Sequence, residues 1–208
     1  MARPAQPEKR RALARRAVGV LQVLGLEVSM SRVAAELGVK RPTLLYHLPT
    51  RADIARVALE DLLTRQAAYV MAEVNRHDHP IDRLDAQVRA VHAFHDGREG
   101  RLVFLAQAIA TSTADQMAAI IAVGNRVFEA HRTDAANRIR AGIDAGIVHP
   151  CDADALVSLV RSVIDGLVVQ RVMVGVDLGP SHQFLWQHVL APLKKDCDAA
   201  TFHLTESP

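Results

Sequence analysis

The 208-residue chain is half apolar and under a quarter charged, so it has enough apolar material for a folded core. No apolar run approaches the roughly 20 residues that a membrane-spanning helix needs, which argues against a membrane protein. The net charge of +2 is unevenly distributed, because residues 1–51 carry ten Lys/Arg against three Asp/Glu. A basic N-terminal part on a mildly acidic remainder favours contact with a polyanion.

The segment from Ala17 to Leu26 follows several arginines and superficially resembles a secretory signal. Gln22 interrupts it and no small-x-small cleavage site follows, so we expect a folded amphipathic helix and a cytoplasmic protein. The two cysteines, Cys151 and Cys197, are too few for a disulfide framework and fit a reducing compartment.

Helical periodicity predicts three N-terminal helices, at about residues 8–24, 30–37 and 41–48. Ser29 is a good N-cap for the second helix, and Gly38 permits a sharp turn after it. Pro42 is tolerated in the first turn of the third helix. Small Ala34 allows close approach, and four apolar residues have the spacing that joins two short helices at a steep angle: Val33, Leu37, Val39 and Leu44. This pattern predicts a helix-turn-helix.

The third helix is expected to expose a polar face. With Leu44 and Leu48 turned inward, Pro42 and Tyr46 lie on the opposite side. The residues predicted to face DNA are Lys40, Arg41, Pro42, Thr43, Tyr46 and His47. Arg51 begins the next helix, whose free N–H groups and dipole favour a phosphate. The alternative is a helical hairpin with a solvated basic surface.

One run of residues resembles the DNA-binding head of the tetracycline-repressor (TetR) family: Val33-Ala34-x-Glu36-Leu37-Gly38-Val39-Lys40-Arg41-Pro42-Thr43-Leu44, then His47 and Pro49-Thr50-Arg51. The resemblance covers about residues 8–60, and 145–150 also resemble a phrase common before the family's eighth helix. It implies an all-helical homodimer with DNA contacts at Thr43, Tyr46 and His47. The basic side chains of Lys40 and Arg41 would lie beside these contacts, and Arg51 would contact a phosphate. Leu45 departs from the pattern, because the family commonly has tyrosine there, and Leu48 replaces an aromatic residue.

The remainder of the chain also reads as helices. Thr50 and Asp53 form a capping box that opens a long fourth helix, and Thr113 with Gln116 opens a seventh. The others are expected near residues 81–95, 98–110, 152–174 and 181–195, the last of them kinked or ended by Pro192. We therefore predict an all-α fold of about nine helices, with a helix-turn-helix head (residues 1–50) and a ligand-binding and dimerisation body (residues 51–208).

The last two helices carry more apolar surface than one packing face needs. We interpret the excess as a four-helix bundle between two subunits, as the family resemblance favours; an intrachain core is the alternative. The predicted interface residues are Leu156, Leu159, Val160, Val163, Leu167, Leu185, Trp186 and Val189.

Polar and aromatic residues within apolar helices are the candidates for a small-molecule pocket. They are Phe94, His95, Phe104, Gln107, Phe128, His131 and Gln170. The set contains no acid and lies in apolar helices, so we expect a hydrophobic or aromatic effector.

The function predicted from these features is a ligand-responsive repressor, whose effector tilts the fourth helix, changes the separation of the two recognition helices and weakens DNA binding. We predict no catalytic residue, no metal and no cofactor. One alternative is a metal-assisted hydrolase that uses His92 and His95, three residues apart on one helix. Another is a structural nucleic-acid-binding protein without an effector.

Overall fold

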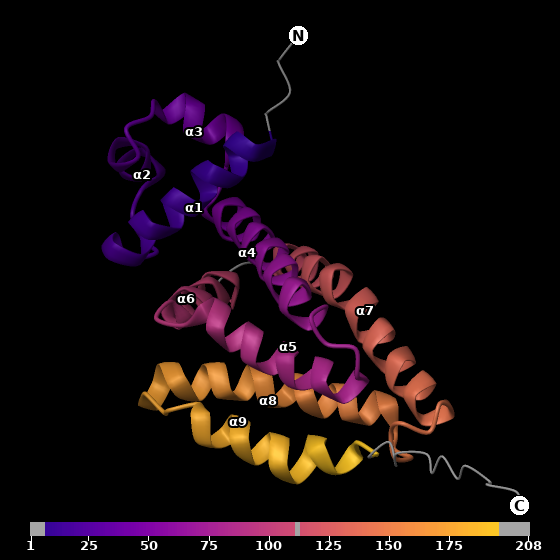
Figure 1. The fold of residues 1–208 in the computed structure, drawn as a ribbon. Coiled ribbons are helices and arrows are strands. Elements are labelled where there is room, and N and C mark those ends of the chain that lie inside the picture. Colours follow the sequence, from indigo (N-terminus) through magenta and orange to yellow (C-terminus); the bar gives the residue numbers. More distant parts are fainter. Residues whose placement is uncertain (1–6, 111–112, 196–208) are drawn as a thin grey trace, which may run out of the picture.

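The computed structural model describes residues 7–110 and 113–195, and this part of the chain forms nine α-helices (Figure 1). They are α1 (Pro7–Leu24), α2 (Met30–Glu36), α3 (Arg41–His47), α4 (Arg51–Val74), α5 (Pro80–His95), α6 (Glu99–Ala110), α7 (Ala114–Asp144), α8 (Ala153–Val174) and α9 (Gly179–Leu185). The predicted all-α fold is confirmed. Cys197 and the side chain of Gln116 lie outside the described residues.

Local capping explains where several helices begin. The side chains of Ser29 and Thr50 accept hydrogen bonds from the backbone N–H groups three residues later, as predicted. Asp152 accepts the N–H groups of Asp154 and Ala155, both at 3.0 Å, at the start of α8. Gly38, at φ +67°, makes the turn between α2 and α3.

Two hydrophobic clusters divide the fold into a head and a body. The head cluster joins α1–α3 to the first half of α4 and includes Leu105 of α6. The body cluster joins the second half of α4 to α5, α7, α8 and α9. In Figure 1 the head lies at one end of the molecule and α8 with α9 at the other, so α4 is the helix that connects the two cores.

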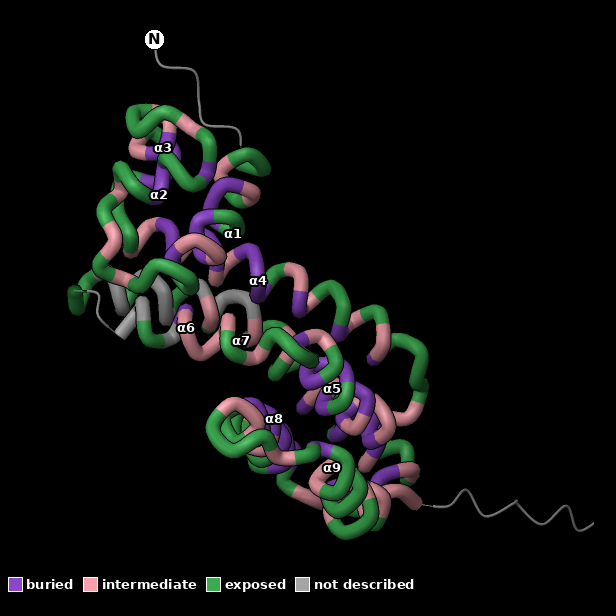
Figure 2. The backbone as a smooth tube through the Cα atoms, turned by 90° about the vertical axis from the view of Figure 1, so that its left-hand side faces the viewer, coloured by how far each residue is buried: buried purple, intermediate pink, exposed green. Residues whose placement is uncertain are grey.

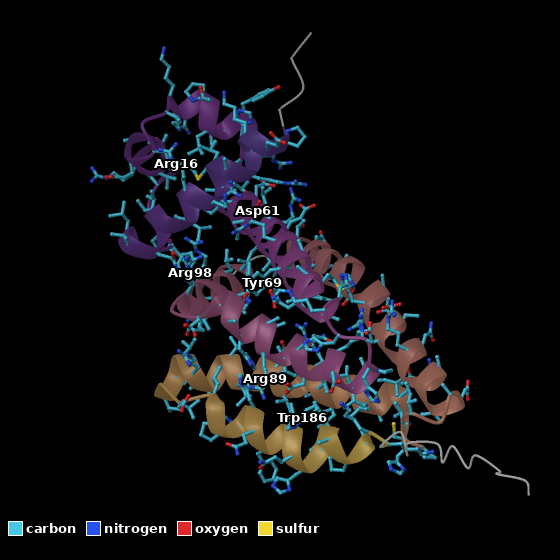
Figure 3. All side chains as sticks on the ribbon, in the orientation of Figure 1. Arg16, Asp61, Tyr69, Arg89, Arg98 and Trp186 are labelled. Carbon is cyan, nitrogen blue, oxygen red and sulfur yellow. The ribbon has the colours of Figure 1, made fainter. Side chains whose placement is uncertain are left out.

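Arginines of α1 fasten the head internally and to α4. Arg10 Nε donates to the His47 carbonyl at 2.9 Å, and Arg16 Nη2 donates to the Leu37 carbonyl at 2.7 Å, so each binds the C-terminal end of one short helix. Asp61 of α4, labelled in Figure 3, is buried and accepts hydrogen bonds from Arg15 and Arg65, each at 3.0 Å. Because its two partners lie on α1 and α4, this carboxylate holds the two helices together.

The C-terminal helix ends in a way that Pro192 explains. After α9 the chain continues as a short π-helix (Trp186–Leu190) and a 3-10 helix (Ala191–Leu193), because proline has no N–H to continue the α-helical ladder. The segment then pairs with the α7–α8 turn, where the His149 N–H donates to the Leu193 carbonyl at 2.8 Å. No helix within residues 7–110 and 113–195 has both the length and the apolar character to cross a membrane.

Candidate functional site

The surface of α3 has the orientation that the sequence predicts. Leu44 and Leu48 are fully buried against the head core. Lys40, Arg41 and Pro42 are exposed, Thr43 is half-buried, and Tyr46 is 50% exposed. This short helix therefore presents two positively charged side chains at its N-terminal end, and a hydroxyl and a phenol along its outer face. These groups suit phosphates and base edges respectively.

His47 departs from that face. Its side chain is only 7% exposed, and its ring lies edge-on to Tyr46 with centroids 5.1 Å apart. Nδ1 is buried and has no hydrogen-bond partner among the described residues. Burial, together with the charges of Lys9 and Arg10, lowers the pKa of His47. The ring turns inward because α3 ends here and Leu48 enters the core. His47 was predicted to face DNA, but its side chain does not lie on the exposed surface of α3.

Arg51 occupies the first turn of α4, as predicted, but its side chain is engaged within the head. Its guanidinium donates to the Leu26 carbonyl in the α1–α2 turn, and Nη1 lies 3.8 Å from a Glu27 carboxylate oxygen. A phosphate at this helix N-terminus would compete with both contacts. Its predicted phosphate contact stays a prediction.

A cavity lies between α4, α5 and α7, with one residue from α8. The residues that line it are Gln66, Ala67, Val70, Met71 and Val74 of α4, Pro80, Arg83, Leu84, Gln87 and Val91 of α5, Phe128, His131, Asp134, Ala135 and Arg138 of α7, and Arg161 of α8. Its interior space open to water-sized molecules is about 60 Å³. That space holds a few waters, so a drug-sized ligand must push the helices apart.

Two of the seven predicted pocket residues, Phe128 and His131, line this cavity. His95 lies directly behind it, buried, with Nε2 2.9 Å from Oε1 of the lining residue Gln66. The other four lie elsewhere: Phe94 and Phe104 pack against the head core, and Gln107 and Gln170 are exposed. The α4 stripe at residues 66, 70 and 74 was not among the predicted pocket residues, although its four-residue spacing marks a single helix face.

His92 forms a different cluster from the one predicted. Its Nε2 faces the Ile164 carbonyl at 3.1 Å, and its Nδ1 lies 2.7 Å from Nε2 of His182 on α9. A carbonyl only accepts, so Nε2 of His92 donates to it, and Nδ1 accepts from His182. Burial is the main cause that lowers the pKa of both rings.

His92 and His95 therefore do not converge on one site. Both nitrogens of His92 are engaged with α8 and α9, whereas His95 faces α4. Within the described residues, no group of three or more His, Cys, Asp or Glu side chains has the arrangement of a metal site. The geometry gives the hydrolase interpretation no support.

Helices α8 and α9 include many exposed residues (Figure 2), and several of these are large apolar residues. Met173 is 76% exposed, Phe184 63%, Val169 48% and Leu159 47%. Of the eight predicted interface residues, only Leu159 belongs to this exposed set. Four are buried within the chain, Leu156, Val160, Leu167 and Leu185, and three are half-buried, Val163, Trp186 and Val189. Most of the predicted set therefore packs inside one chain, where it has little surface for a partner.

Solved structures with the same architecture are known. A candidate transcriptional regulator from Saccharomonospora viridis, solved with choline, has a TM-score of 0.70 at 22% identity, covering 92% of this chain and 100% of that one. A candidate TetR-family regulator from Rhodococcus sp. has a TM-score of 0.66 at 18% identity, covering 86% and 95%. The protein AibR, solved with isovaleryl coenzyme A and operator DNA, has a TM-score of 0.57 at 18% identity, covering 77% of this chain and 86% of that one.

No protein-family model and no curated protein sequence matches the chain. Because the sequence identity between this chain and these structures is below 25%, the similarity establishes the architecture and not the activity. The helix-turn-helix head, the connecting α4 and the α8–α9 end together give this chain the fold of the TetR-family transcriptional regulators.

Proposed function

We propose that the protein is a ligand-responsive, DNA-binding transcriptional regulator that acts as a homodimeric repressor. One observation carries this proposal: α4 is a single helix whose first half belongs to the head core and whose second half lines the cavity. A ligand that moves the wall of the cavity therefore moves part of the head. Because its target is chromosomal DNA, we propose that it works in the cytoplasm.

In the proposed complex, α3 lies in the major groove of operator DNA. Lys40 and Arg41 contact phosphates or guanine, and Thr43 and Tyr46 contact base edges. The buried ring of His47 supports the helix instead of reading a base. A protein of the same fold has been solved with operator DNA, which supports this role for the head.

Two copies are proposed to associate through the outer side of α8 and α9. This surface combines Leu159, Val169, Met173 and Phe184, and exposed apolar patches of this kind mark protein interaction sites. A symmetric dimer presents two heads, and a palindromic operator requires recognition helices about one DNA turn, or ~34 Å, apart.

The switch is proposed to run along α4. A bound effector widens the cavity and displaces the second half of α4, where Val70 and Val74 form the wall. The Asp61 carboxylate, held by Arg15 of α1, makes the head follow α4. The spacing of the two α3 helices then changes and operator affinity falls. Thermodynamic linkage requires operator DNA to lower effector affinity by the same factor.

An electrophoretic shift assay tests the DNA-binding part. The probe is DNA that flanks the protein's own gene, and unrelated DNA is the competitor. We expect a specific complex that a Lys40→Ala/Arg41→Ala variant weakens at least tenfold, since each charge-assisted contact contributes roughly 1–3 kcal/mol. Arg140→Ala removes an exposed arginine of α7 that pairs with Asp154, and serves as the matched control. A complex that the unrelated DNA abolishes equally well would contradict a regulator.

The thermodynamic linkage between effector binding and operator binding provides a test of the proposed switch. A compound found in a thermal-shift screen is titrated into the free protein and into the protein–operator complex. We expect weaker binding to the complex, by the same factor as the loss of operator affinity. Equal affinity in both titrations would rule out the proposed mechanism.

A further inference from the structure

The cavity of α4, α5 and α7 carries unbalanced positive charge. Its charged lining residues are Arg83, Asp134, Arg138 and Arg161. Asp134 pairs with Arg138 at 2.8 Å, and Arg161 pairs with Asp165 at 2.7 Å. No described carboxylate lies within salt-bridge distance of Arg83, so Arg83 supplies the uncompensated charge.

Arg83 is also held in place. Its Nη1 donates to the His77 carbonyl and its Nη2 to Asn75 Oδ1, both at 2.9 Å. Both acceptors are neutral, so they orient the guanidinium at the α4–α5 turn without cancelling its charge. A cation fixed before binding loses little conformational entropy when an anion arrives, which favours affinity.

The wall beside Arg83 is apolar and elongated. Val70, Leu84 and Val91 lie along it, and the α5 residues from 80 to 91 extend about 16 Å at the rise of an α-helix. At the far end Arg161 lies over the Phe128 ring, 4.6 Å from its centroid. The cavity therefore has a charged end at the α4–α5 turn and an aromatic end.

We infer that the effector is an amphipathic organic anion whose carboxylate binds Arg83 and whose apolar body extends along α5 towards Phe128. This inference rests on the proposed function and specifies the chemistry of its ligand. Arg83 selects the charge of the effector, and the apolar wall selects its length.

Isothermal titration calorimetry with three ten-carbon probes tests the inference: decanoate, 1-decanol and decyltrimethylammonium. The probes share their apolar chain and differ in charge. We expect decanoate to bind at least about tenfold more tightly than either of the others, the size of one charge-assisted hydrogen-bonded contact. Arg83→Gln keeps a side-chain donor for Asn75 and His77 but removes the charge, and should lose this preference. Arg83→Lys keeps the charge and should retain most of it.

Arg89→Gln is the matched control, because Arg89 lies on the same helix but pairs with Asp85 outside the cavity. Its preference for decanoate should equal that of the wild type. Equal affinity for decanoate and decanol, tighter binding of the ammonium probe, no decanoate binding, or a preference that survives in Arg83→Gln would each overturn the inference. Operator binding is measured without any probe, so failure of the regulator proposal shows separately as the absence of a specific DNA complex.

Discussion

Replacing Phe184 by glutamate should convert the proposed dimer into monomers. The side chain is 63% exposed on α9. A phenylalanine side chain has roughly 200 Å² of surface that can be buried, so about 130 Å² of apolar surface at Phe184 is exposed on each protomer. At about 25 cal/mol per Å², burying it contributes about 3 kcal/mol, and a two-fold axis doubles the gain. If only half of this is realised, Phe184→Glu still raises the dissociation constant more than a hundredfold.

Sedimentation velocity over a range of micromolar concentrations measures the dissociation constant directly. Val23→Glu is the control, because Val23 is 82% exposed at the end of α1 and undergoes the same change from apolar to acidic. It should leave the dimer intact. An unchanged dissociation constant for Phe184→Glu, or a wild-type protein that stays monomeric, would refute the assignment of this surface.

Three further predictions concern stability. The pKa values of buried His92 and half-buried His182 lie below the usual 6.5, so on acidification these rings take up protons at a higher pH in the unfolded chain than in the folded protein. The free energy of unfolding therefore falls as the pH drops below about 6.5, by up to about 1.4 kcal/mol per pH unit for each ring. Urea unfolding at fixed protein concentration should show this, with a shallower fall for His182→Gln; a slope that this variant leaves unchanged argues against the pair. A Cβ on Gly142 would lie 2.7 Å from Val148 Cγ2, so Gly142→Ala should cost about 1–3 kcal/mol. In Val148→Ala the same change should cost clearly less, because only the tight contact with Pro80 Cγ at 3.1 Å remains; an equal loss in both backgrounds contradicts the clash with Val148. Asp61→Asn removes the charge that binds two half-exposed arginines and should cost about 2 kcal/mol, the size of a hydrogen bond to a charged group; a wild-type urea midpoint would contradict this.

The orientation of α3 was predictable because it depends on local spacing alone. Leu44 and Leu48, four residues apart, fix which side of a two-turn helix faces inward, and Tyr46 then lies outside. The positions of the His47 and Arg51 side chains were not predictable. They depend on tertiary packing: Arg10, 37 residues away in the sequence, binds the His47 carbonyl at the end of α3, and Arg51 donates to the carbonyl of Leu26, 25 residues away.

The body shows the same limit more clearly. Helix α8 has apolar residues on two sides, and its sequence does not say which side packs on its own chain. The structure turns Val160 and Ile164 inward and Leu159 and Met173 outward. The charge of the cavity was also hidden, because its arginines are spread over three helices and their neutralisation depends on the carboxylates that the fold brings near. An effector expected to be simply hydrophobic or aromatic is now inferred to carry a negative charge as well.

The arginines that stabilise the head through contacts within the protein affect the salt dependence of DNA binding. Of the basic residues between positions 7 and 51, Arg10, Arg15, Arg16, Arg32 and Arg51 bind carbonyls or carboxylates of the protein itself. Those without such a partner there are Lys9, Arg11, Lys40 and Arg41. Each phosphate that a protein neutralises contributes about −0.9 to the slope of log affinity against log salt concentration. Two heads with four such basic side chains each therefore give a slope of about −7. Engagement of every Lys and Arg in residues 1–51 would give about −18. The ionic-strength dependence of operator binding thus measures how much of the N-terminal charge is retained for DNA and how much holds the head together.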